Sequence, residues 1–270
     1  MGNVWVGTSS FASPNVRGAL NSSSAASNDL LAAYAVRFPA VELDSVFYRE
    51  PGADTVAGWS NATAESFRFS VRVPRDVTHV DRLGLPARAA RFVESLRPLG
   101  PRLGCVLFTT PPSFECDVSR FASILDVMPD PLATAWEFRH PSWLCPDVLQ
   151  LLASRNAAPV VVESQDESSS AELMPGGALA ERWGFPFVYV RFRREHYTYA
   201  DLCVWGEILG DVVGEGRDVC AFFRQAPAAT AYATALYELL AEAKAATFDE
   251  DTTPMANPPL NFELTRPAFR

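Results

Sequence analysis

Residues 67–73 read Phe-Arg-Phe-Ser-Val-Arg-Val, and this alternation of apolar and polar side chains decides the fold. Successive side chains of a strand point to opposite faces, so the apolar residues share one face and Arg68, Ser70 and Arg72 share the other. An apolar face that packs on helices and a polar face that points inward are typical of a strand in a closed barrel. The stretch therefore predicts a barrel strand with arginine side chains in the interior.

Seven other short apolar runs are spread along the chain, and segments with helical spacing lie between most of them. The expected strands are Val4–Gly7, Val41–Phe47, Phe67–Val73, Cys105–Thr109, Thr134–Phe138, Pro159–Glu163, Phe187–Phe192 and Asp218–Phe223. Their starts recur about every 30 residues, which is room for one strand, one helix and two loops. Eight such units predict an α/β fold, a (β/α)8 TIM-type barrel, and an open doubly wound sheet is the alternative.

The barrel is expected to form a single domain over residues 1–246, because the chain of 270 residues has the size that this fold needs. The sixth helix is expected to be degenerate, since Ser164–Gly184 contains a Ser/Glu tract and a Pro-Gly-Gly turn signal. Ala12–Ser27 is Ser/Asn-rich and is expected to be an irregular loop that could close as a lid. Residues 247–270 are expected to be a Pro-rich acidic tail.

Charge and composition exclude several classes of protein. The net charge of −9 argues against broad binding to nucleic acid, although a local basic pocket stays open. Of the 23 basic residues only Lys244 is a lysine, so any cationic site is built from arginine. The five cysteines are widely spaced and indicate neither a disulfide framework nor a zinc finger. No apolar run reaches the ~18 residues of a membrane span, and we expect a cytoplasmic protein without a membrane partner.

The inward faces of the expected strands carry charged side chains. Strand side-chain alternation places carboxylates and guanidinium groups near the strand carboxyl ends, where barrel enzymes have their active sites: Glu42, Asp44, Arg72, Glu137, Arg139, Glu163 and Arg191. Unpaired charges there would cost several kcal/mol, so the groups must pair with each other or with a ligand. A closed set of structural ion pairs, such as Glu42 with Arg72 or Glu163 with Arg191, is the alternative to a ligand site.

The densest motif is Trp-Glu-Phe-Arg-His-Pro-Ser-Trp at 136–143. It combines a carboxylate, a guanidinium and an imidazole, which are the groups that acid/base catalysis on an anion needs. We expect Glu137 to be the catalytic carboxylate, with help from Glu42 or His140. A loop-bracing hydrogen bond is the alternative for His140, because its side chain points away from the face that carries Glu137.

The remaining candidates are expected to bind the substrate: Arg72, Arg139, Arg191, Tyr48, Asp44, Ser9, Trp143, His79 and Glu163. Glu42 and Asp44 lie on one strand face, and their oxygen atoms would also suit half of a magnesium or manganese site. We expect no cofactor and leave a divalent metal open, since none of the three histidines has the spacing of a zinc motif.

Six motifs resemble the YecE-like family over residues 4 to about 225: Gly-Thr-Ser at 7–9, Val-Glu-Leu-Asp-Ser-Val-Phe-Tyr-Arg at 41–49, Phe-Arg-Phe-Ser-Val-Arg-Val-Pro-Arg at 67–75, Leu-Phe-Thr-Thr-Pro-Pro-Ser-Phe at 107–114, Glu-Phe-Arg-His-Pro-Ser-Trp at 137–143 and Phe-Val-Tyr-Val-Arg at 187–191. The resemblance implies a TIM-type barrel with a polar pocket, in a family without an assigned biochemical function. It highlights Glu42, Ser45, Tyr48, Arg72, Pro74, Glu137, Arg139, His140, Trp143 and Arg191.

The chain departs from that family pattern at several positions: Ser10-Phe11, Asp44, Arg72, Thr109, Arg193-Arg194 and Arg224-Gln225. These differences imply another substrate or a loss of activity. The first hypothesis is an enzyme that hydrolyses or isomerises a small phosphorylated or carboxylated substrate. A metal-assisted phosphoesterase using Glu42, Glu137 and Glu163 is an alternative, and a non-catalytic protein that binds an anionic metabolite is another.

Overall fold

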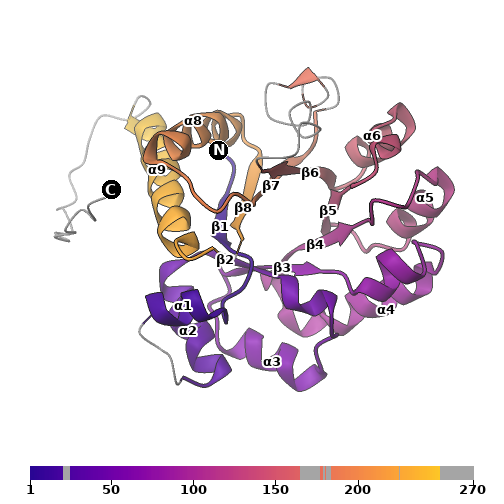
Figure 1. Ribbon diagram of the computed structural model, residues 1–270, viewed down its shortest axis with the longest axis horizontal. Coiled ribbons are helices and arrows are strands. Elements are labelled where there is room, and N and C mark those ends of the chain that lie inside the picture. The colour runs from indigo at the N-terminus through magenta and orange to yellow at the C-terminus, as the bar shows by residue number, and fades with distance from the viewer. Residues whose placement is uncertain (21–24, 165–176, 179, 181–183, 225, 250–270) are drawn as a thin grey trace.

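The computed structural model describes residues 1–20, 25–164, 177–178, 180, 184–224 and 226–249, which form a barrel of parallel strands ringed by helices (Figure 1). The eight-stranded sheet has the order β1-β8-β7-β6-β5-β4-β3-β2. The strands are β1 (Val4–Thr8), β2 (Ala40–Leu43), β3 (Arg68–Arg72), β4 (Leu103–Thr109), β5 (Ala133–Glu137), β6 (Ala157–Glu163), β7 (Phe187–Phe192) and β8 (Asp218–Phe223). Strands β2 to β8 pair with one another in sequence order, and β1 pairs with β8 but not with β2. The barrel prediction is confirmed, and the open doubly wound sheet is wrong.

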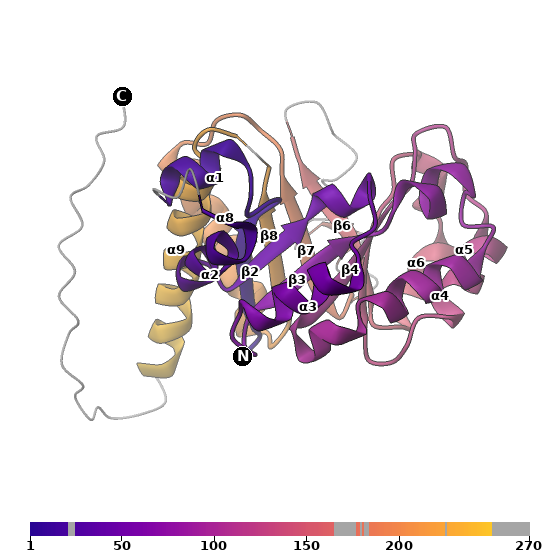
Figure 2. The same cartoon turned by 90° about the horizontal axis from the view of Figure 1, so that it is seen from below.

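The helices cover the outer faces of the strands (Figures 1 and 2). They are α1 (Pro14–Ala19), α2 (Ser27–Arg37), α3 (Ala53–Asn61), α4 (Pro86–Ser95), α5 (Val118–Asp126), α6 (Pro146–Ala153), α8 (Tyr199–Gly214) and α9 (Ala229–Asp249). Short helical turns are η1 (Asp44–Phe47), η2 (Asp76–Val80), η3 (Arg97–Arg102) and η4 (Pro141–Trp143). Among the helices that the structure describes, none combines the length and the apolar character that a membrane span requires.

Several expected boundaries differ from the observed ones. Strand β2 ends at Leu43 rather than Phe47, because the chain turns into η1 as soon as it leaves the barrel wall. The expected loop Ala12–Ser27 contains α1, whose first turn is capped by the hydroxyl of Ser13. Helix α9 continues to Asp249, three residues into the expected tail. The Ser164–Gly184 segment and residues 250–270 lie almost entirely outside the described residues.

The two ends of the strand order, β1 and β2, are joined through a tyrosine. Gly7 lets them approach closely, since a Cβ atom there would lie 2.0 Å from the carbonyl oxygen of Ala40. Tyr34 of α2 places its hydroxyl in this seam, where it accepts from the Thr8 amide at 2.8 Å and donates to the Ala40 carbonyl at 3.1 Å. The side chain of a helix therefore satisfies backbone groups that a regular ladder would pair.

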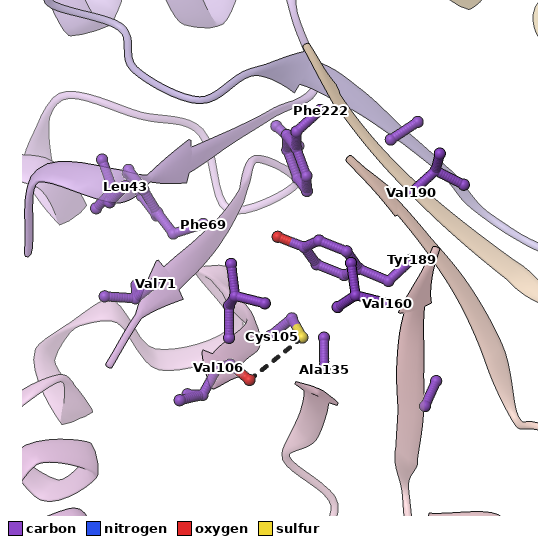
Figure 3. Close-up of a cluster of buried hydrophobic side chains, with 14 of the residues drawn as sticks. Leu43, Phe69, Val71, Cys105, Val106, Ala135, Val160, Tyr189, Val190 and Phe222 are labelled. Carbon is purple, nitrogen blue, oxygen red and sulfur yellow. Dashed lines mark hydrogen bonds between the residues drawn. The ribbon is translucent and has the colours of Figure 1, made fainter. Parts of the chain in front are cut away.

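The alternation expected for the strands is observed in the barrel interior. Tyr189, Cys105 and Phe222 point into the space enclosed by the strands (Figure 3). The Tyr189 hydroxyl bonds to the hydroxyl of Ser70 at 2.6 Å and donates to Glu42 at 2.7 Å. The polar layer nearest the strand carboxyl ends is thus connected to the centre of the barrel by hydrogen bonds.

Candidate functional site

A cavity of about 300 Å³ lies at the carboxyl ends of the strands. It is lined by residues from β1, β2, β3, β5, β7 and β8 or from the loops that follow them: Ser9, Glu42, Asp44, Arg72, Arg139, Arg191, Phe192, Arg193, Phe222 and Arg224. This volume is at the small end of the range for metabolite sites. The cavity is also at the end of the barrel where catalytic groups of this fold lie.

Glu137 is buried and does not line the cavity, but it contacts three arginines that do. Its carboxylate accepts from Arg139 Nε at 2.8 Å, from Arg193 Nη2 at 2.7 Å and from Arg191 Nη1 at 2.5 Å. Burial by itself would raise the pKa of this carboxyl, but Arg191, Arg193 and Arg139 outweigh burial and hold its pKa well below the usual range. Glu137 therefore stays ionised at all physiological pH values, which suits a fixed counter-charge better than a proton carrier.

Arg191 connects three carboxylates across the barrel. Its Nη2 atom lies 2.7 Å from Glu42 and 3.0 Å from Asp44, and its Nη1 atom contacts Glu137. Burial would lower the pKa of this guanidinium, whereas Glu42, Glu137 and Asp44 raise it well above its usual value. Strand β7 thus supplies the charge that makes buried Glu42 tolerable.

Arg72 forms the wall of the cavity on the side of β3. Its Nη1 atom donates to Asp44 at 2.8 Å, and its guanidinium lies 3.7 Å from the centre of the Phe47 ring. The side chain is only 7 % exposed, and its buried Nε–H has no partner among the described residues. Burial is the main reason that the pKa of Arg72 is lowered.

The cavity carries more positive than negative groups. Five guanidinium groups line it. Two carboxylates, those of Glu42 and Asp44, also line it, and Glu137 adds a third through its contact with Arg191. Arg224 contributes to this surplus, because no carboxylate of the described residues forms a salt bridge with it. Counted at full charge, these eight side chains of the described residues have two positive charges more than negative ones.

His79 and Tyr48 lie near Phe47 rather than in the lining of the cavity. The His79 ring is 4.9 Å from the Phe47 ring, and its Nδ1 atom bonds to the Thr78 hydroxyl at 2.9 Å. Burial, followed by Arg72 and Arg139, lowers the pKa of His79 to about 4, so its imidazole is neutral at pH 7. Tyr48 is 79 % exposed, and its ring makes an edge contact with the Phe47 ring, with the ring centres 5.1 Å apart.

The loop after β5 is braced by the two residues that the sequence placed in the site. His140 Nδ1 bonds to the Ser142 hydroxyl at 2.8 Å and caps η4. Trp143 is fully buried, donates its indole N–H to the Phe114 carbonyl at 2.7 Å and stacks on Phe138. The contacts of His140 thus agree with the alternative in which it braces its loop through a hydrogen bond. Neither His140 nor Trp143 lines the cavity.

The two ion pairs named as examples of the structural alternative do not form, because each carboxylate has another partner. Glu42 pairs with Arg191 instead of Arg72, because Arg72 meets Asp44 in the turn that follows β2. Glu163 pairs with Arg194 Nε at 2.6 Å and accepts from the Tyr197 hydroxyl, outside the cavity lining. The inward position of each charge was predictable, but the choice of partner depends on the strand that lies opposite.

The structure brings together seven of the site residues expected from the sequence, if Glu137 is counted because it contacts a lining arginine: Ser9, Glu42, Asp44, Arg72, Glu137, Arg139 and Arg191. It leaves five outside the lining: Tyr48, His79, His140, Trp143 and Glu163. Arg193 and Arg224 also line the cavity, although the sequence did not select them. Arg193 is two residues after Arg191, so strand alternation could have predicted that its side chain points the same way. Arg224 lies just beyond the end of β8, where strand alternation no longer predicts side-chain direction.

The carboxylates of the cavity are engaged by arginines rather than grouped around a common point. Within the described residues, no group of three His, Cys, Asp or Glu side chains is placed to hold a metal ion. Glu163, the third carboxylate of the metal hypothesis, bonds to Arg194 and Tyr197 instead of facing Glu42 and Glu137. In the described residues, each of these carboxylates is therefore bound to at least one arginine.

The fold and the cavity together define a (β/α)8 barrel with an arginine-rich site at the carboxyl ends of its strands. The sequence model of the family described as "Protein of unknown function DUF72" matches residues 5–258, and the chain belongs to this family. It is similar to UPF0759 protein YunF of Bacillus subtilis, with 27% identity over 230 residues, covering 73% of this chain and 81% of YunF. UPF0759 protein YecE of Escherichia coli K12 is 28% identical over 112 residues, 41% of each chain. The YecE-like resemblance is therefore confirmed.

Solved structures of the family share the fold. A DUF72 family protein of Enterococcus faecalis superimposes with a TM-score of 0.70 at 20% identity, covering 96% of this chain and 100% of its own. A DUF72 family protein of Thermotoga maritima gives a TM-score of 0.66 at 22% identity, covering 91% and 99%. At these identities the likeness establishes the barrel and leaves the chemistry to the residues of the cavity.

Proposed function

We propose that the cavity binds a small phosphorylated or carboxylated compound and that the protein is an enzyme acting on it by acid/base hydrolysis or isomerisation. The observation that carries the proposal is that, among the described residues, guanidinium groups outnumber carboxylates around a cavity of about 300 Å³. A dianion would neutralise this surplus. Guanidinium groups also present paired N–H donors that match carboxylate and phosphate oxygens.

We assign some residues of the cluster to binding the anion and others to positioning the arginine side chains. Arg72, Arg139 and Arg224 line the cavity and would contact the anion, where they would also stabilise negative charge that develops during the reaction. Glu137 would keep the guanidinium groups around it in place. The proton would be carried by Asp44, whose side chain is 27% exposed, or by the neighbouring Glu42.

A protein that binds the anion without turnover is the second candidate. It is favoured by the engagement of every carboxylate of the cluster with an arginine, which resists proton transfer. The two candidates differ at Asp44 and Glu42. For an enzyme, Asp44→Asn or Glu42→Gln would abolish turnover of any compound that binds, whereas a binding protein has no turnover to lose.

The experiment that tests the anion site is a thermal-shift titration with inorganic phosphate and with phosphorylated and carboxylated metabolites. Ligand at about 100 times its Kd adds ~2.7 kcal/mol, or roughly 5–11 °C in Tm for a chain of this size. Arg139→Ala should remove the shift. Arg97→Ala is the matched control, because Arg97 is 81% exposed and is not among the cavity residues. A shift that survives Arg139→Ala, or no shift with any anion, would contradict the proposal.

A further inference from the structure

Two cysteines that are far apart in the sequence meet on the outer side of the barrel. Cys116 lies in the loop between β4 and α5, and Cys145 is the N-cap residue of α6. Their sulfur atoms are 3.9 Å apart, and both residues are partly exposed. A small oxidant can therefore reach two thiols that are already in contact.

The approach of these thiols is held by the surrounding loops. The Cys116 amide donates to the Ser142 hydroxyl at 2.8 Å. Two residues earlier in the same loop, the Phe114 carbonyl accepts from the indole of buried Trp143 at 2.7 Å. Because backbone and core contacts join the two loops, the sulfur separation does not depend on side-chain rotation alone.

We propose that Cys116 and Cys145 form an oxidation site at which a hydroperoxide converts the two thiols into an intramolecular disulfide. One sulfur, as its thiolate, attacks the peroxide, so that an S–O bond forms, the O–O bond breaks and the leaving oxygen takes up a proton. The second sulfur attacks the sulfenic acid, the S–S bond forms and water leaves. Two thiols lose two electrons and two protons, and hydrogen peroxide is reduced to two molecules of water.

Formation of the bond brings the sulfur atoms closer together. They must move from 3.9 Å apart to about 2.05 Å. Burial and the neighbouring Cys145 raise the pKa of Cys116 to about 12, so this thiol is protonated at neutral pH. The rate of oxidation should therefore rise steadily between pH 7 and pH 9.

The disulfide would tie together loops that border the cavity. The Arg139 amide donates to the hydroxyl of Thr110 at 3.4 Å, and these two residues begin the loops that carry Cys145 and Cys116. Oxidation should raise Tm by several degrees, because it closes a loop between residues 29 positions apart in the sequence. The proposal concerns the thiols alone and does not depend on the anion site.

The test is oxidation of the full chain by hydrogen peroxide, followed by thiol counting in denaturant and tryptic mapping. The number of free thiols should fall from five to three, and peptide 103–120 should become joined to peptide 140–155. Cys116→Ser and Cys145→Ser should each abolish the joined peptides, which also separates Cys116 from Cys105 in the same peptide. Cys203→Ser is the matched control, because Cys203 is also partly exposed but lies on α8.

Three outcomes would overturn the proposal. Five thiols that persist after peroxide treatment at pH 9 would show that the pair does not react as a disulfide. Joined peptides that persist in Cys116→Ser would assign the bond to Cys105. A disulfide-linked dimer on a non-reducing gel, without the intramolecular bond, would show that the exposed thiols react between molecules instead.

Discussion

Replacing Glu137 by glutamine should strongly destabilise the barrel, because it leaves three guanidinium groups around a neutral side chain. Glu137 is 2 % exposed at its side chain and contacts Arg139, Arg191 and Arg193. Removal of one partner from a buried ion pair costs about 3–5 kcal/mol. The lower half of this range applies here, since Arg191 keeps Glu42 and Asp44 and the other two guanidinium groups can reach water.

The loss can be measured by urea unfolding, where the midpoint should fall while the slope m is unchanged. Heating should show a decrease in Tm of roughly 6–16 °C for about 3–4 kcal/mol in a chain of this size. Glu94→Gln is the control, because the 70% exposed Glu94 forms a surface pair with Arg97. Its effect should stay within about 0.5 kcal/mol.

The pH dependence gives a second check on the same residue. The pKa of Glu137 is depressed in the folded protein, so the stability that it contributes is present above the unfolded pKa near 4.5 and is lost as pH falls toward the folded pKa. The difference between wild type and Glu137→Gln should therefore shrink as the pH is lowered from 7 to 3. A difference below about 1 kcal/mol at pH 7, or one that does not change with pH, would refute the assigned role.

Two further predictions concern groups outside the cavity. Tyr34→Phe removes the hydroxyl that joins Thr8 to Ala40 in the β1–β2 seam, and the unpaired buried groups should cost about 1–3 kcal/mol in urea unfolding; an unchanged midpoint, as expected for the exposed Tyr48→Phe control, would contradict this. For His79, an NMR titration of the ring protons should give a pKa of about 4. The stability tied to its neutral ring should fall as pH drops from about 6.5 through 4, and titration near 6.5 would contradict the predicted burial.

The departures from the sequence-based expectations occur where local patterns no longer apply. Periodicity of two predicted the inward faces of β3, β5 and β7, because it is a property of neighbouring residues in a strand. It did not locate the end of β2, where Asp44 already belongs to η1. Nor did it show that Trp143, which lies beside catalytic-type residues in the sequence, is a buried support of its loop.

By itself the sequence determined the barrel, the layer of charged side chains and the reliance on arginine, because composition and strand alternation are local properties of the chain. Tertiary structure alone decided which charges meet. Arg191 and Glu42 are 149 residues apart, and Cys116 and Cys145 are 29 apart. Such pairs depend on the order, stagger and tilt of strands around the closed barrel, and no spacing along the chain records these quantities.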